Sequence, residues 1–184
     1  MKQIQLLQYD YKSHFSVFSI DNLLPEDYLQ KITDKTIELT TNDTMDRSTN
    51  VKANMTSYIE ILKHSEYQQM FDSIMEYLNI FIKLRTPHWN RDIDYYIKEA
   101  WGMQHTKGDY TQNHVHPNTN WSIAFYLRVP TNDTYMYFDD FNDTLPLATN
   151  RLFIFPGLAK HRVTAHTSDI TRISIAANIN AHQN

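Results

Sequence analysis

The sequence predicts an α+β fold in which helices come first and a run of antiparallel strands follows. Apolar residues repeat at helical spacing in the first half, and beyond residue 95 they form short runs separated by turns. The 184 residues, 41% of them hydrophobic, suit one domain with a substantial core. We expect a single domain, 1–184, with a helical support region at 1–94. The strand core at 95–181 should close into a barrel or jelly roll.

The first helix is predicted to begin directly after Pro25. Glu26 and Asp27 would lie in its first turn, where acidic side chains interact favourably with the helix dipole. The polar residues 40–55 that follow are expected to form an exposed loop. The apolar positions at helical spacing are Leu29, Ile32, Thr36 and Leu39.

A second helix is predicted from about residue 66 to residue 84. Ser65 and Gln68 have the spacing of a capping box at its start, and Pro87 would end it. Its wide apolar stripe consists of Tyr67, Met70, Phe71, Ile74, Leu78, Phe81 and Ile82.

The second half of the chain predicts five strands and a shorter one around His161. Each strand is rich in β-branched and aromatic residues and is bounded by turn-forming residues. The five predicted strands are 95–103, 122–129, 134–138, 151–155 and 171–179.

Composition excludes several classes of function. The absence of cysteine excludes disulfides, thiol catalysis and iron–sulfur ligation, and three glycines cannot build a glycine-rich phosphate loop. The formal net charge of -4 argues against a nucleic-acid-binding protein. The sequence shows no membrane span and no signal peptide, so we expect a cytoplasmic protein. We also expect a monomer or a homodimer.

The stretch QNHVHPNT is the first candidate site. In an extended chain His114 and His116 point to the same side, which would let two imidazoles bind one metal ion. The alternative is a polar surface turn, because Pro117 and Asn118 follow at once.

The last predicted strand carries the second candidate site. One face holds Ile173, Ile175, Ala177 and Ile179, and the opposite face holds Arg172, Ser174, Ala176 and Asn178. A face of small residues inside a barrel leaves a cavity, and an arginine directed into a cavity needs an anionic partner. The alternative places Arg172 on the solvent face of an edge strand.

Five stretches follow one another in a recognisable order: EAWGMQHTKGDYTQNHVHPN, WSIAFYLRVP, TYMYFDD, NRLFIFPGLAKHRV and RISIAANI. Together they resemble the iron(II)- and 2-oxoglutarate-dependent oxygenases, in particular the prolyl-hydroxylase-like branch with small microbial and viral members. The resemblance covers roughly residues 99–180 and implies a double-stranded β-helix.

The resemblance implies roles for individual residues. His114 and His161 would be the two histidine ligands of an iron(II) ion. Arg172 and Ser174 would bind the distal carboxylate of 2-oxoglutarate. The other expected contacts are Tyr126 to the same carboxylate, and Gln104 and Tyr110 to cosubstrate or substrate.

His116 departs from the family pattern, because the usual ligand set is two histidines and one carboxylate. We expect His116 to be the third ligand. Two alternatives remain: Asp139 or Asp140 supplies a carboxylate, or His116 is the first ligand and Asn118 takes the aspartate position.

The resemblance implies hydroxylation of a prime substrate by dioxygen, with 2-oxoglutarate converted to succinate and carbon dioxide. The substrate would be a protein side chain such as proline, or a small molecule. Two other functions stay open. One is a metalloenzyme that does not use 2-oxoglutarate, of the zinc or cupin type. The other is a non-enzymatic jelly roll that serves in binding or structure.

Overall fold

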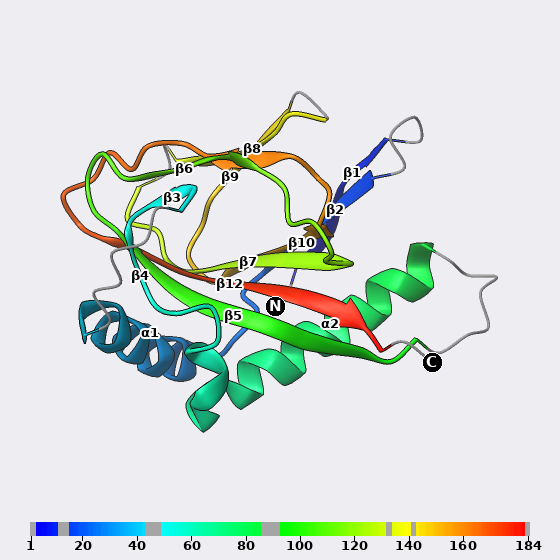
Figure 1. The fold of residues 1–184 in the computed structure, drawn as a ribbon, viewed down its shortest axis with the longest axis horizontal. Helices are drawn as coiled ribbons and strands as arrows, with labels where there is room; N and C mark the ends of the chain where they lie inside the picture. Colours follow the sequence, from blue (N-terminus) through cyan, green and yellow to red (C-terminus); the bar gives the residue numbers. More distant parts are fainter. Residues whose placement is uncertain are drawn as a thin grey trace.

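The computed structural model consists of two facing antiparallel sheets, with two helices on the outer side of the larger sheet (Figure 1). The structure describes residues 3–10, 15–42, 49–85, 93–131, 134–140 and 143–182. The predicted α+β class, with helices supporting a two-sheet strand core, is confirmed.

The larger sheet has seven strands within the described residues, in the order β1-β2-β10-β7-β12-β5-β4. All its pairings are antiparallel. The strands span Gln3–Asp10 (β1), Phe15–Asp21 (β2), Arg151–Pro156 (β10), Trp121–Arg128 (β7), Arg172–Ala181 (β12), Tyr95–His105 (β5) and Asn54–Met55 (β4).

The smaller sheet has five strands over the same described residues, in the order β3-β6-β11-β8-β9. It lies across the larger sheet at the top of Figure 1. Its strands span Val51–Lys52 (β3), Tyr110–His114 (β6), His161–Val163 (β11), Tyr135–Phe138 (β8) and Asp143–Pro146 (β9).

Two helices form where the apolar periodicity predicts them, at Glu26–Asn42 (α1) and Gln68–Arg85 (α2). Short 3-10 turns at Ile61–Lys63 (η1) and Ser65–Tyr67 (η2) lead into α2. The buried face of α1 contains threonines whose hydroxyls donate to the carbonyl four residues earlier, so their burial leaves no hydroxyl unpaired.

Strand β12 alternates as predicted and separates two apolar cores. Ile173 and Ile175 pack toward the helices, together with residues of α2 such as Ile74 and Leu78. The opposite face, which includes Ala176 and Asn178, looks into the space between the sheets. The second core fills part of that space and includes aromatic residues from β7, β8 and β10. The space left beside it is where ligands can bind.

Gly102 lets α1 approach β5 closely. A β carbon at this position would lie 2.8 Å from Cγ2 of Thr36, closer than carbon atoms pack. The close contact fixes which face of β5 looks away from the helices. Met103 and Trp101 lie on that inner face and line the space between the sheets.

The structure corrects the expectation for the first half of the chain. Residues 1–94 contribute strands β1 to β4 as well as helices, and β2 pairs directly with β10 of the strand core. The predicted loop 40–55 begins as the last turn of α1 and ends as β3 and β4, while 43–48 lie outside the described residues. The predicted capping box does not form, because Ser65 lies inside the 3-10 turn that continues into α2.

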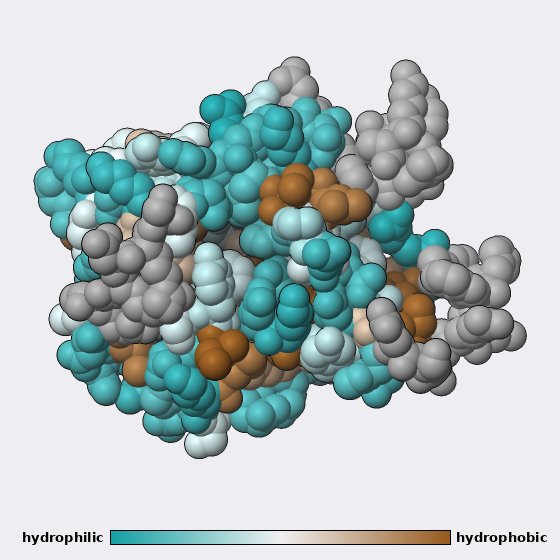
Figure 2. Space-filling view, in the orientation of Figure 1, coloured by the Kyte–Doolittle hydropathy of each residue, from teal (hydrophilic) through white to brown (hydrophobic). Residues whose placement is uncertain are grey.

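The surface seen in Figure 2 is mainly hydrophilic, with apolar side chains in separate patches. Among the described residues, neither helix has the length and apolar character that crossing a bilayer requires.

Candidate metal and anion site

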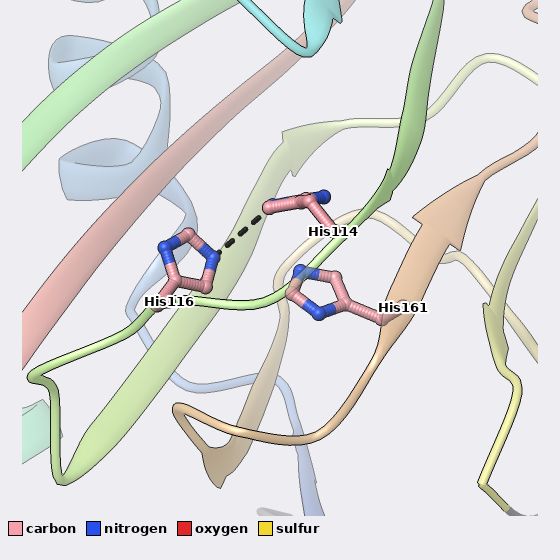
Figure 3. Close-up of side chains that lie close together, drawn as sticks. All are labelled: His114, His116 and His161. Carbon is pink, nitrogen blue, oxygen red and sulfur yellow. Dashed lines mark hydrogen bonds between the residues drawn. The ribbon is translucent and has the colours of Figure 1, made fainter.

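Three histidines meet between the two sheets, as Figure 3 shows. His114 ends β6 and His161 begins β11, and the two are directly paired across the smaller sheet. His116 lies two residues beyond β6. One ligand nitrogen from each ring lies within 4.8 Å of the others. We call His114, His116 and His161 the histidine cluster.

Hydrogen bonds to backbone carbonyls set the proton position on two of these rings. Nδ1 of His114 is 2.8 Å from the carbonyl oxygen of Gln112, and Nδ1 of His161 is 2.8 Å from that of Ala159. A carbonyl oxygen only accepts, so Nδ1 carries the proton in both rings. Nε2 is then unprotonated with its lone pair available, which is how metal-binding histidines are usually oriented.

The third histidine is anchored by a close backbone contact. The amide of His116 donates to the carbonyl of Gly157 at 2.7 Å. A β carbon at Gly157 would lie 2.9 Å from the carbonyl oxygen of His116 and 2.4 Å from that of Thr119, so only glycine fits there. Nε2 of His116 lies 3.2 Å from Nε2 of His114.

Burial keeps the histidine cluster neutral. Burial is the main cause that lowers the pKa of His114 and holds the pKa of His161 well below the ordinary value. Burial and then the neighbouring His114 lower the pKa of His116 to about 4. Neutral imidazole is the form that binds a metal, so protons do not compete for these rings near pH 7.

No carboxylate joins the histidine cluster within the described residues. Asp139 accepts from the Asn113 amide and lies 3.7 Å from the Lys160 ammonium. Asp140 accepts from the Lys160 backbone amide at 2.9 Å. Asn118 occupies a left-handed turn position with φ 63° and does not line the cavity. The alternatives that used these side chains as ligands are therefore not supported.

Arg172 is fully buried at the start of β12, on the strand face that looks between the sheets. None of its three guanidinium nitrogens has a hydrogen-bond partner among the described residues. Burial lowers its pKa, and nearby Tyr126 and Asp109 oppose that shift. Oδ2 of Asp109 already accepts two hydrogen bonds from Thr106. A buried guanidinium without a partner is costly, so an anion that reached this position would relieve that cost.

Tyr126 and Ser174 lie beside that guanidinium. They are cross-strand partners on β7 and β12, and both are buried. Burial raises the pKa of Tyr126 to about 12, while Arg172 lowers it, so the phenol stays protonated and can donate a hydrogen bond.

In the structure His105 lies among the side chains around Arg172, and Gln104 does not. His105 is the direct cross-strand partner of Arg172 and is 2% exposed, and neither of its ring nitrogens has a partner in the part of the chain that the structure describes. Its pKa is held well below the ordinary value by burial and then by Arg172. Gln104 is on the opposite face of β5, where its side chain accepts from Thr40 of α1 at 3.0 Å. The expected role of Gln104 in cosubstrate binding is therefore corrected.

Tyr110 also lies away from this group. It is 37% exposed, does not line the cavity, and has the ammonium of Lys52 6.0 Å from its ring centre.

A cavity of about 380 Å³ lies beside the histidine cluster. It is lined by the whole histidine cluster and by Tyr126, and it continues along β12 past Ala176 to Asn178. Its volume lies in the range of sites for small ligands. Arg172 and Ser174 are not among its lining residues, so Tyr126, which interacts electrostatically with the Arg172 guanidinium, is what links the cavity to the buried cation.

Comparison with known proteins places the fold in one structural class. No model of a known protein family matches the sequence, and no curated protein does. Solved structures do match over most of the chain.

One is the viral collagen prolyl hydroxylase vCPH from Paramecium Bursaria Chlorella virus-1 in its 2OG complex. It is 14% identical, with 90% of this chain and 96% of that chain covered and a TM-score of 0.67. A prolyl-4-hydroxylase from Pseudomonas putida is 13% identical, with coverages of 91% and 93% and a TM-score of 0.66. HygX from Streptomyces hygroscopicus, with nickel and 2-oxoglutarate bound, is 9% identical, with coverages of 89% and 82% and a TM-score of 0.63.

The chain therefore has the double-stranded β-helix fold of the 2-oxoglutarate-dependent oxygenases. The predicted resemblance to the prolyl-hydroxylase-like branch is confirmed for the fold.

Proposed function

We propose that the protein is an iron(II)- and 2-oxoglutarate-dependent dioxygenase that hydroxylates a prime substrate and releases succinate and carbon dioxide. The observation that carries the proposal is the pairing of two incomplete sites in one fold. The histidine cluster lines the cavity. The Arg172 guanidinium, buried and unpaired among the described residues, lies at the start of the β12 face that carries the cavity-lining Ala176 and Asn178.

Both halves of the site fit the groups that the fold implies. Three imidazole nitrogens that converge within 4.8 Å suit one divalent metal ion, held by His114, His116 and His161. The metal would supply the activation of dioxygen, which no side chain of this chain can perform. The protein orients the ligand nitrogens through their Nδ1–H bonds and surrounds them with apolar side chains such as Phe155.

The cosubstrate would contribute the missing anion. Its distal carboxylate would accept two parallel hydrogen bonds from Arg172 and one each from Ser174 and Tyr126. The neighbouring structures support this choice, since vCPH is a 2OG complex and HygX contains both nickel and 2-oxoglutarate. A hydrolytic zinc centre would leave the buried guanidinium unexplained.

Anaerobic titration tests the proposal directly. We expect the protein with stoichiometric iron(II) to develop a visible metal-to-ligand charge-transfer band when 2-oxoglutarate is added. Absorption spectra over a range of 2-oxoglutarate concentrations would measure the band and its midpoint. Glutarate, which lacks the 2-oxo group, is the matched control and should give no band. A protein that binds iron(II) but shows no band at saturating 2-oxoglutarate would contradict the proposal.

His105 is proposed as a further hydrogen-bond donor to the same carboxylate. Replacing His105 with phenylalanine keeps a ring in the buried position and removes the donor. We expect the dissociation constant for 2-oxoglutarate to rise about tenfold, since a hydrogen bond to a charged group contributes about 1.5–3 kcal/mol. Iron(II) affinity should stay at the wild-type level. Calorimetric titration with each ligand separates the two effects.

The variant His105→Gln serves as the conservative comparison, because its amide can donate in place of the ring. We expect it to recover most of the lost affinity. The exposed His182 provides a control in the variant His182→Phe, which should bind 2-oxoglutarate like the wild type. Equal affinity in His105→Phe and wild type would rule out the proposed contact.

A further inference from the structure

A β-bulge places two charged side chains at one end of the cavity. Asn178 of β12 pairs with Glu99 of β5, but the next residue, Ile179, pairs with Ile97. Lys98 therefore has no partner on β12 and is the extra residue of the bulge. Bulges redirect side chains and are common beside active sites. Without the shift Lys98 would face the helices with Ala100 and Gly102. With it, Lys98 and Glu99 both line the cavity.

The carboxylate of Glu99 is held in position by a buried amide. Nδ2 of Asn178 donates to Oε2 of Glu99 at 2.9 Å, and Oδ1 of Asn178 accepts from the Ser122 hydroxyl at 3.1 Å. Asn178 is 6% exposed and Ser122 is 1% exposed, so both are fixed by the core. The carboxylate is therefore oriented before any ligand arrives, which reduces the entropic cost of binding.

The ion pair between Glu99 and Lys98 is weak. Nζ of Lys98 lies 3.8 Å from Oε1 of Glu99, beyond hydrogen-bond distance, and its side chain is 42% exposed. A solvent-exposed pair of this kind contributes little to stability. A ligand cation that forms true hydrogen bonds to Oε1 can replace it, and Lys98 can then turn toward solvent.

Trp101 connects this carboxylate to the histidine cluster. It lies two residues along β5 from Glu99, about 6.6 Å away on the same strand face. Its ring centre is 6.1 Å from that of His116, and Tyr58 packs against it edge-on at 5.1 Å. The buried indole nitrogen of Trp101 has no partner among the described residues. The wall beside His116 thus offers an unused donor, an aromatic surface and, further out, a fixed carboxylate.

We propose that the prime substrate is a basic amino acid or a basic side chain of a peptide, whose ammonium or guanidinium binds Glu99 beside Trp101. The inference rests on the proposed function, which places the reacting centre at the histidine cluster. An acceptor on the substrate, such as a carboxylate or a peptide carbonyl, would take the hydrogen bond from the Trp101 indole. The aromatic face of Trp101 adds attraction for the cation.

Binding of matched probes tests the proposal. The protein is loaded with nickel(II), which prevents turnover, and with 2-oxoglutarate, and is then titrated calorimetrically. The probes are L-arginine against L-citrulline, and L-lysine against N6-acetyl-L-lysine, each free and as the N-acetyl amide. We expect at least one cationic probe to bind about tenfold more tightly than its neutral counterpart. Comparison of the free amino acids with their N-acetyl amides distinguishes a free amino acid substrate from a residue in a peptide.

Two variants should change the affinity for the cationic probe in opposite directions. Glu99→Gln should remove the preference for the cationic probe. Lys98→Gln removes the competing ammonium and should strengthen its binding by up to about fivefold. Glu76→Gln, at an exposed position of α2, makes the same change of charge far from the cavity and should leave binding unchanged.

The reversed pattern, in which Lys98→Gln weakens probe binding and Glu99→Gln strengthens it, would overturn the proposal in favour of an anionic substrate. Equal binding of charged and neutral probes, or no binding of any cationic probe, would overturn it as well. Binding of 2-oxoglutarate to the nickel-loaded protein is measured first in the same sample. If 2-oxoglutarate does not bind, the proposed function is contradicted. If it binds, the probe titrations test the cation site separately from the proposed function.

Discussion

Replacing Arg172 with methionine is expected to stabilise the ligand-free protein while it abolishes cosubstrate binding. In the absence of a ligand the guanidinium is fully buried and its three nitrogens have no partner among the described residues. A methionine of similar length would remove this unpaired charge, and we expect the free energy of unfolding to rise by about 1–3 kcal/mol. The dissociation constant for 2-oxoglutarate should rise about a hundredfold or more, because two charge-assisted hydrogen bonds are lost.

Urea denaturation of the ligand-free protein and calorimetric titration with 2-oxoglutarate would measure the two effects. Arg151→Met is the matched control, because the same substitution there breaks an existing ion pair with Asp21, in which Nη2 lies 2.8 Å from Oδ2. That variant should lose stability and keep its affinity for 2-oxoglutarate. If Arg172→Met were destabilised and still bound 2-oxoglutarate normally, Arg172 would be a structural residue and the anion site would be refuted.

Replacing His161 with alanine is expected to remove metal binding and 2-oxoglutarate turnover together. His161 supplies one of three convergent nitrogens. Removing a hydrogen-bond partner of a metal ligand typically lowers metal affinity about 10- to 100-fold, and removing the ligand itself should lower it further. We therefore expect iron(II) affinity to fall about a hundredfold or more. Iron content of the purified folded protein and succinate production are the measurements. His64→Ala, a histidine outside the cluster, is the control.

The variant His116→Asp addresses the departure from the usual ligand set. It creates two histidines and one carboxylate, and the negative charge attracts the cation more strongly than a neutral ring does. We expect iron(II) to bind at least as tightly as in the wild type, whereas His116→Ala should bind it more weakly. A wild-type iron content in both His161→Ala and His116→Ala would mean that the histidines are incidental, which is the outcome expected of a non-enzymatic jelly roll.

The strand core was predictable because its strands are rich in β-branched and aromatic residues, and in β12 the two faces differ clearly in residue type. β12 alternates isoleucine with small and polar residues, and the structure places the two sets as expected, with Ile175 in the helix-side core and Ala176 on the cavity. The strands that were not predicted include β1 and β2, which precede the first helix, and several short ones. β3 and β4 have two residues each, and pairing with β6 and β5 stabilises them where local preference does not.

The site was only partly predictable for a related reason. The histidine cluster and Arg172 follow from motif spacing, but the choice between Gln104 and His105 depends on which face of β5 points inward. The segment YYIKEAWGMQH has apolar residues on both faces, so alternation does not decide. Tertiary contacts decide it, since Gly102 packs on Thr36 of α1 and thereby turns His105 toward Arg172. The redirection of Lys98 rests on a bulge, which has no signal in the sequence.

The histidine cluster depends on the register of two very short strands. His161 opens β11, a strand of three residues, and pairs directly with His114 at the end of β6, a strand of five. In β11 the buried positions alternate with Arg162, which is exposed. A slip of one residue would turn His161 outward and bring Arg162 into the cavity, so that a cation replaces a ligand. Correct strand pairing in the smaller sheet is thus a condition for the proposed metal site, because a mispaired molecule would present a cation where the native one presents an imidazole nitrogen.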